Sequence, residues 1–293
     1  MFGPAAVLAA ATLLPAQPPR PFEIKDGDRV VWLGNTLVER EQRYGYWETA
    51  LYAAFPNASF TVRNLGWSGD TVWGESRAGF DPPAKGFERL VSLTLELKPT
   101  VIFVGYGTNE SFEGEAGLAK FEQGLNKLLD ALKPANARVV LFSPAMFHGG
   151  RSPSAVARRE ALGRYTDVIR KTAEARGAYF ADLGQKTLGI QLAVTENGIH
   201  PTEEGYKALS WSFLAVLGHK SEPLDWSKLD PLRRAVVEKN QLFFYRWRPQ
   251  NETYLFGFRK HEQGKNAKEV AEFDPLVSKA EAEIEKLRKT LLK

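Results

Sequence analysis

The stretch Arg29-Val30-Val31-Trp32-Leu33-Gly34-Asn35-Thr36 decides the fold, because a strand-like apolar run leads directly into a glycine and two small polar residues. The arrangement recurs twice: residues 59–63 precede the polar stretch 66–71, and residues 100–104 precede 107–110. In an open α/β sheet the carboxyl ends of the strands form one rim, where ligands bind. We therefore expect residues far apart in sequence to meet at a single site.

The rest of the body alternates helix-like and strand-like segments. Helices are expected over 39–55, 86–98, 117–133, 153–176 and from His200 to about 217, and two further strands over 138–142 and 178–181. Within 86–98 the expected buried residues are Leu90, Val91, Leu93, Leu95 and Leu97. Five strand-like runs separated by helices predict an α/β fold with a parallel sheet covered by helices on both faces.

Three segments are expected along the chain: residues 1–19, a body over 22–220, and a C-terminal extension over 221–293. The extension is basic, is rich in aromatic residues around 242–258, and ends in a helix from about residue 275. In that helix Leu276, Ala280, Ile284, Leu287 and Leu291 recur at spacings of three and four. We expect the extension to pack on the body or on a partner; its oligomeric consequences are not determined by the sequence.

The N-terminus favours export, to the periplasm or outside the cell. Residues 5–14 are apolar but too short to span a bilayer, and a proline-bearing segment follows, as at the end of a signal peptide. No Lys or Arg precedes Arg20, so a frayed apolar terminus is the alternative. No other segment is apolar enough for a membrane span.

Charge and cysteine content exclude several function classes. Residues 224–293 hold 15 Lys+Arg and 11 Asp+Glu, interspersed, which is typical of a solvated surface rather than a nucleic-acid-binding patch. With no cysteine, thiolate metal sites, disulfides and a cysteine nucleophile are excluded. We expect no metal and no cofactor.

The polar stretches contain the groups that ester cleavage requires: a nucleophile, a base and donors for the developing oxyanion. Thr36 follows the first strand and could present its hydroxyl to the rim. Gly69 follows the second strand, where the absence of Cβ lets its N–H approach a reacting carbonyl. The Asn109 amide could donate to the same oxygen, and His200, before a helix, could act as the base.

On these motifs the chain resembles the SGNH, or GDSL, hydrolase family over residues 26–218. The family carries a Gly-Asp-Ser-like block, a glycine block, a Gly-x-Asn block and an Asp-x-x-His block, in that order. Gly69, Asn109 and His200 match the last three. The resemblance implies a flavodoxin-like three-layer α/β/α domain that hydrolyses acyl esters, often on carbohydrates.

Two positions depart from the family pattern. Thr36 occupies the position of the serine nucleophile, and Asn197 replaces the aspartate that orients the histidine. A β-branched nucleophile is stiffer at χ1, and an amide carries no charge to stabilise an imidazolium. Glu196 could supply a carboxylate instead, or deamidation of Asn197, favoured by Gly198, could create the missing aspartate.

Aromatic and charged residues near the rim suit a sugar that stacks on one face and forms hydrogen bonds at its edge. The candidate substrate-binding residues are Trp67, Asp70, Trp73, Arg77 and Tyr106, whereas Trp32 is expected in the core. The preferred function is hydrolysis of a small-molecule or polysaccharide ester. The alternatives are a catalytically impaired relative that binds carbohydrate or another partner, and an assembly subunit dominated by its C-terminal extension.

Overall fold

The computed structural model describes residues 21–146, 152–187, 194–219 and 223–292. Its centre is a parallel five-stranded sheet in the order β2-β1-β3-β4-β5. The strands are β1 (Asp28–Gly34), β2 (Phe60–Asn64), β3 (Val101–Gly105), β4 (Arg138–Phe142) and β5 (Tyr179–Ala181). This order is that of the flavodoxin-like fold, and it confirms the predicted α/β class.

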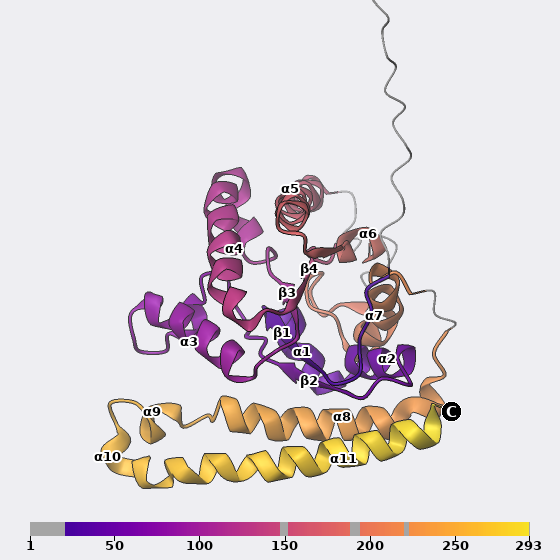
Figure 1. Ribbon diagram of the computed structural model, residues 1–293. Coiled ribbons are helices and arrows are strands. Elements are labelled where there is room, and N and C mark those ends of the chain that lie inside the picture. The colour runs from indigo at the N-terminus through magenta and orange to yellow at the C-terminus, as the bar shows by residue number, and fades with distance from the viewer. Residues whose placement is uncertain (1–20, 147–151, 188–193, 220–222, 293) are drawn as a thin grey trace, which may run out of the picture.

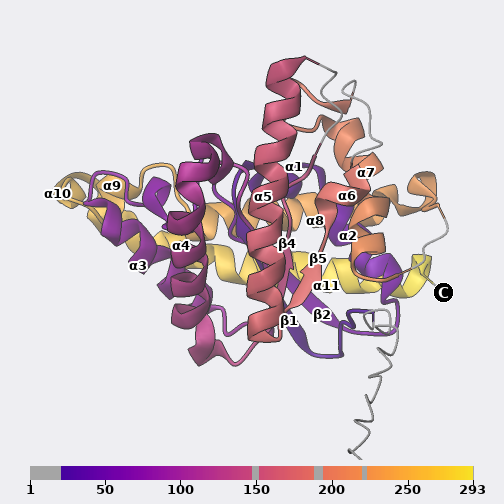
Figure 2. The ribbon, with the colours of Figure 1, turned by 90° about the horizontal axis from the view of Figure 1, so that it is seen from above.

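Helices cover both faces of the sheet, which completes the three predicted layers (Figures 1 and 2). One face carries α1 (Thr36–Tyr44), α2 (Tyr46–Ala54) and α7 (Glu203–Val216), and the other carries α3 (Pro83–Glu96), α4 (Leu118–Leu132) and α5 (Pro153–Arg176). Alternating residues divide between the two cores, as a strand buried on both faces requires: Val30 and Trp32 lie in the first core, Val31 and Leu33 in the second. Trp32 is a core residue, as expected. A short helix, α6 (Leu183–Thr187), follows β5.

The predicted helix over 39–55 is two helices, α1 and α2, separated by Gly45. Gly45 has φ +69°, and a Cβ there would lie 3.0 Å from a methyl of Val237 in the C-terminal extension. The break therefore serves a close helix contact that the local periodicity does not encode. Residue 45 is the left-handed C-cap of α1, a conformation that favours glycine.

One prediction about a buried face is wrong in part, and in a second helix the apolar spacing marks only some of the buried residues. In α3, Leu90 is fully buried, but Val91, Leu93, Leu95 and Leu97 are half-buried, because that helix lies at the margin of the second core. In the last helix, α11 (Phe273–Leu291), Leu276 is 47% exposed, and the buried residues are Val277, Ile284 and Arg288. The Arg288 side chain turns inward because its guanidinium donates to the carbonyls of Phe55 and Ala58.

The C-terminal extension packs on the body as a long antiparallel pair of helices, α8 (Trp226–Trp247) and α11, beside the edge strand β2 (Figure 1). The short helices α9 (Glu252–Leu255) and α10 (Lys260–Gln263) and a 3-10 segment over Gly264–Glu272 connect them. Lys239 of α8 is fully buried and donates to the Val62 carbonyl of β2 at 2.9 Å. The pair thereby covers a strand edge that would otherwise present unpaired backbone groups.

No helix in the described ranges combines the length and the apolar character needed to cross a bilayer. The signal peptide expected over residues 1–19 lies outside the described residues.

Candidate active site

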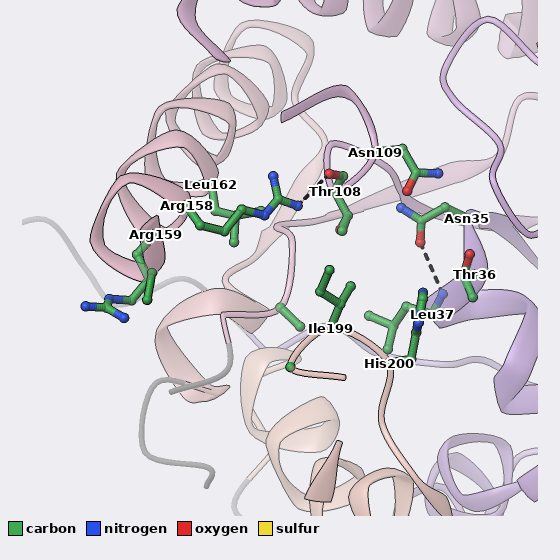
Figure 3. A pocket seen from close by; sticks show the side chains of 13 residues that line it. Asn35, Thr36, Leu37, Thr108, Asn109, Arg158, Arg159, Leu162, Ile199 and His200 are labelled. Carbon is green, nitrogen blue, oxygen red and sulfur yellow. Dashed lines mark hydrogen bonds between the residues drawn. The ribbon is translucent and has the colours of Figure 1, made fainter. Parts of the chain in front are cut away.

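The site lies where β1 and β3 lie side by side and the chain leaves their carboxyl ends toward opposite faces of the sheet, a common ligand position in open α/β sheets. Gly34 and Gly105 pair at this edge, and a Cβ on Gly34 would lie 2.6 Å from the Gly105 carbonyl oxygen. A pocket of about 80 Å³ opens there (Figure 3). Its lining comes from five separate stretches of the chain and includes Thr36, Asn109 and His200.

The glycine loop after β2 is held tightly against the start of α1. The Trp67 N–H donates to the Gly34 carbonyl at 2.9 Å, and the Ser68 N–H donates to the Glu39 carboxylate. A Cβ on Gly66 would lie 2.3 Å from the Glu39 backbone nitrogen. The loop therefore needs glycine at position 66 in order to reach Thr36.

Thr36 and Gly69 are in direct contact. The Gly69 N–H donates to Thr36 Oγ1 at 3.2 Å, and Gly69 has φ +76°, a conformation that a residue with a Cβ rarely adopts. Asn35 caps α1 by accepting the Leu37 N–H at 3.2 Å. The hydroxyl thus stands at a helix N-terminus beside a glycine N–H, where a developing negative charge would be stabilised.

Asn109 lies at the pocket but one of its donors is occupied. Its Nδ2 donates to the Asp70 carbonyl at 2.7 Å, which leaves the second amide hydrogen for a ligand. Glu110, whose role was not evident from the sequence, fixes the same region: it accepts the Val72 N–H at 2.9 Å and the Gly107 N–H at 2.8 Å. Burial raises the pKa of Glu110 to about 7, against the lowering effect of these N–H groups.

Asp70, Arg77 and Tyr106 do not line the pocket, contrary to the substrate contacts expected for them. All three are buried: Arg77 Nε donates to Asp70 Oδ2 at 2.7 Å, and the Tyr106 hydroxyl donates to the same oxygen at 3.0 Å. Arg77 also donates to the Leu65 carbonyl at 2.8 Å. Burial raises the pKa of Asp70 although Arg77 opposes it. Because the polar groups of these three residues bond mainly to one another, the cluster supports the glycine loop from the interior and does not line the pocket.

The two candidate stacking residues are also engaged by the protein. Trp67 lies 3.4 Å from the Arg248 guanidinium carbon, measured to the ring centroid, and its ring is 5.8 Å from that of Trp247. Trp73 packs on α4, where a Cβ on Gly124 would be 2.7 Å from its ring. The extension thus occupies one face of Trp67, and neither tryptophan lines the pocket beside Thr36.

His200 reaches the pocket from a tight loop that precedes α7. The Glu196 N–H donates to the His200 carbonyl at 2.8 Å, and Thr202 caps α7 through the Gly205 N–H. Tyr206 fixes that helix against α1 by donating to the Leu37 carbonyl at 2.8 Å. Across the described ranges, Thr36 and His200 share the pocket without a mutual hydrogen bond.

The Asn197 side chain contacts the His200 ring, with Nδ2 3.0 Å from Nδ1. Asn197 Oδ1 accepts the N–H groups of Ile199 at 3.2 Å and His200 at 3.0 Å. If the amide were flipped, its Nδ2 donor would face these two N–H donors, so the observed orientation is the one that the hydrogen bonds allow. Because Nδ2 donates to Nδ1, the neutral ring carries its proton on Nε2. An aspartate at this position would hold the opposite tautomer, the one that accepts a proton at Nε2.

Glu196 does not take the place of the missing aspartate in the structure. Its carboxylate forms an ion pair with Arg40, which, with burial opposing it, holds the pKa of Glu196 below its usual range. Burial and then the Arg40 charge lower the pKa of His200, whereas Glu196 opposes them. The second compensation, deamidation of Asn197, stays a prediction; the attacking nitrogen, Gly198 N, donates to Thr195 Oγ1 at 3.0 Å.

Two pocket residues were given no role from the sequence: Arg158, and Asn35 of the first polar stretch. Arg158 of α5 donates to Ser111 Oγ at 2.7 Å and to the Thr108 carbonyl at 2.9 Å (Figure 3). Asn35 is 2% exposed, and its Nδ2 has no partner within the described ranges. The described residues include no group of His, Cys, Asp or Glu side chains arranged to hold a metal ion.

Comparison with known proteins gives one family and a set of similar folds. The model of the GDSL-like lipase/acylhydrolase family matches residues 27–208. A catalytic mutant of an acetylxylan esterase from Geobacillus stearothermophilus is 20% identical with a TM-score of 0.53, over 67% of this chain and 97% of that one. An α/β hydrolase enzyme from the metagenome of Lake Arreo, Spain, is 21% identical with a TM-score of 0.52, over the same shares. At these identities the two structures establish similarity of fold. No curated protein matches the sequence.

Proposed function

This chain belongs to the GDSL-like lipase/acylhydrolase family, and from that premise we propose that it hydrolyses small acyl esters, with O-acetylated carbohydrate as the substrate class. Family membership supports hydrolysis of ester bonds in general. The observation that carries the finer proposal is the Gly69 N–H bonded to Thr36 Oγ1 at 3.2 Å, in a pocket that Asn109 and His200 also line.

In the proposed reaction Thr36 Oγ1 attacks the acyl carbon and His200 takes its proton. The Gly69 N–H then turns to the oxyanion together with the Thr36 N–H and the second hydrogen of the Asn109 amide. His200 returns the proton to the leaving alcohol, and water later releases the acyl group from Thr36. The pocket volume of about 80 Å³ corresponds to a few water molecules, which favours a short acyl group such as acetyl.

Two further observations support this class of substrate and site. The similar structure from Geobacillus stearothermophilus is an acetylxylan esterase, and its catalytic mutants replace a serine, an aspartate or a histidine. The apolar N-terminal sequence favours export, which suits an extracellular or periplasmic polysaccharide.

One observation favours a second function, a binding module that has lost efficient catalysis. Asn197 donates to His200 Nδ1 and so favours the tautomer whose Nε2 already carries a proton. Such a ring donates a hydrogen bond to a ligand instead of accepting a proton from Thr36. On this reading the same pocket would bind an acetylated sugar and release it unchanged.

An assay of the purified protein on p-nitrophenyl acetate separates these functions. The enzyme requires turnover above the uncatalysed rate that disappears in both Thr36→Ala and His200→Ala. Turnover at background level, with acetylated oligosaccharide still bound, would establish the module. Turnover that survives both substitutions would remove Thr36 and His200 from the reaction. Intact-mass analysis of the active protein tests deamidation of Asn197 in the same experiment.

A further inference from the structure

A second cavity, of about 310 Å³, lies between the family domain and the C-terminal extension. Glu39, Gln42 and Arg43 of α1 form one side. Val237, Gln241, Phe244 and Tyr245 form the other, at spacings of four, three and one along α8, so they share one helical face. The cavity is therefore a groove between two helices, and we call it the α1–α8 groove.

The groove lies along α1, the helix whose N-terminus carries Thr36 at the candidate active site. Thr36, Glu39 and Arg43 are three and then four residues apart, so they lie on one face of the helix. At about 1.5 Å of rise per residue, Arg43 stands about 10 Å from Thr36 along the axis. An acetyl group alone cannot span that distance, but the sugar chain that carries it can.

The end of the groove that is nearer to Thr36 contacts the glycine loop of the candidate active site. The Glu39 carboxylate accepts the Ser68 N–H in the glycine loop and lies 3.5 Å from the Arg248 guanidinium. Arg43, one helical turn further along α1, carries a charge that is among those acting on Glu196, two residues before Gly198. A chain bound in the groove would thus pass directly beside the loop that carries the Gly69 N–H.

The chemistry of the lining suits a sugar. Sugar rings have an apolar face, which stacks on aromatic side chains, and hydroxyl edges, which bond to planar amide and guanidinium groups. Phe244 and Tyr245 supply the aromatic surface. In the described part of the chain, the side chains of Arg43 and Gln250 are exposed and make no hydrogen bond to protein, so their donors are available.

We infer that the α1–α8 groove binds the oligosaccharide portion of the ester, so that the C-terminal extension supplies half of the glycan subsite. This inference rests on the proposed function for its position beside Thr36. It also explains why the extension packs along α1 and across Trp67, because that packing creates the groove.

The test compares a short ester with a long one. In Tyr245→Ala we expect the KM for acetylated xylotetraose to rise about tenfold, while kcat and KM for p-nitrophenyl acetate stay unchanged. Gln241→Ala, at an exposed position, should act in the same direction without affecting folding. Tyr254→Ala is the matched control, since Tyr254 lies in the extension outside the groove. Equal effects on both esters, or none on either, would overturn the inference.

A binding measurement keeps this test independent of hydrolysis. Calorimetric titration of the Thr36→Ala protein with unacetylated tetrasaccharides of β-linked xylose, glucose and mannose reports the groove alone. Binding of at least one of them, weakened about tenfold by Tyr245→Ala, supports the groove even if p-nitrophenyl acetate is not hydrolysed. Failure of all three to bind would overturn it, and so would a concentration-dependent dimer that Tyr245→Ala dissolves, since a second copy would then be the occupant.

Discussion

Two polar clusters of this molecule, each of which contains an asparagine, have different roles. At the α8 interface, Lys239 Nζ lies 2.8 Å from Glu48 Oε1 and donates to the Val62 carbonyl and to Asn240 Oδ1, so all its hydrogens are used in a fully buried site. At the pocket, Asn197 and His200 form their pair on an exposed loop of a few residues. The first cluster fixes the position of α8, whereas the second determines which ring nitrogen of His200 carries the proton.

The difference in burial between the two clusters indicates where a substitution can change the chemistry of this protein without unfolding it. A buried charge that loses its partner costs several kcal/mol, so the Lys239 cluster tolerates little. An exposed amide can be replaced at small cost in stability, yet it decides which nitrogen of His200 carries the proton. Substitutions at the two clusters test this difference.

The largest expected effect is a gain of activity in Asn197→Asp. A carboxylate would accept the backbone N–H groups of Ile199 and His200 with one oxygen and the His200 Nδ1–H with the other, which frees Nε2 to act as a base. We expect the turnover of p-nitrophenyl acetate to rise by about two to four orders of magnitude, with the unfolding midpoint little changed. Asn197→Ser is the control that removes the amide without adding a charge. An unchanged rate in Asn197→Asp would show that the tautomer does not limit the site.

At the other cluster, Lys239→Met is expected to destabilise the protein by about 3–5 kcal/mol, because it leaves the Glu48 carboxylate buried without its cation. Urea denaturation measures this loss. Lys228→Met, at an exposed position on the same helix, should change stability by less than about 0.5 kcal/mol. Adding Glu48→Gln to Lys239→Met should recover part of the loss. A Lys239→Met protein as stable as the Lys228→Met control would show that the buried Lys239–Glu48 pair does not hold α8 in place.

A smaller effect concerns pH. Burial and Arg40 lower the pKa of His200, so the ring should stay neutral below the ordinary histidine value of about 6.5 and become protonated only in more acidic solution. If the neutral His200 ring is the base, kcat/KM should decrease at acidic pH with the same apparent pKa as the ring. Arg40→Gln removes the cation and frees Glu196, so it should move both transitions to higher pH. NMR titration of His200, assigned with His200→Gln, measures the direction, and a shift to lower pH in Arg40→Gln would refute this account.

The smallest expected effect is that of Glu196→Gln. Because Glu196 is exposed and paired with Arg40 and not with the ring, its loss should change turnover by less than about threefold. A large loss of activity would mean that Glu196 turns toward His200 during the reaction, and would restore it as the orienting carboxylate.

Much of the fold could be predicted because strands and helices are encoded by neighbours in the chain. Each of the five strands lies where an apolar run was found, and the turn residues Gly69 and Gly198 take the left-handed conformations that glycine favours. The break at Gly45 could not be predicted, since it depends on Val237, which is far away in the sequence. The burial of Arg288 has the same kind of cause: its partners are the carbonyls of Phe55 and Ala58.

The features of the candidate site also fall into two groups, those that depend on local sequence and those that depend on residues far away in the chain. From the residues alone it could be predicted that Thr36, Gly69 and Asn109 follow strands of one sheet and that His200 precedes a helix, because such positions depend on local pattern. Three features became visible only in the folded chain: Asp70, Arg77 and Tyr106 face one another in the interior, the Asn197 amide nitrogen faces the His200 ring, and α8 forms a groove with α1. Burial and hydrogen-bond partners depend on residues far apart in the chain, and a local pattern of residue types does not record which of them meet.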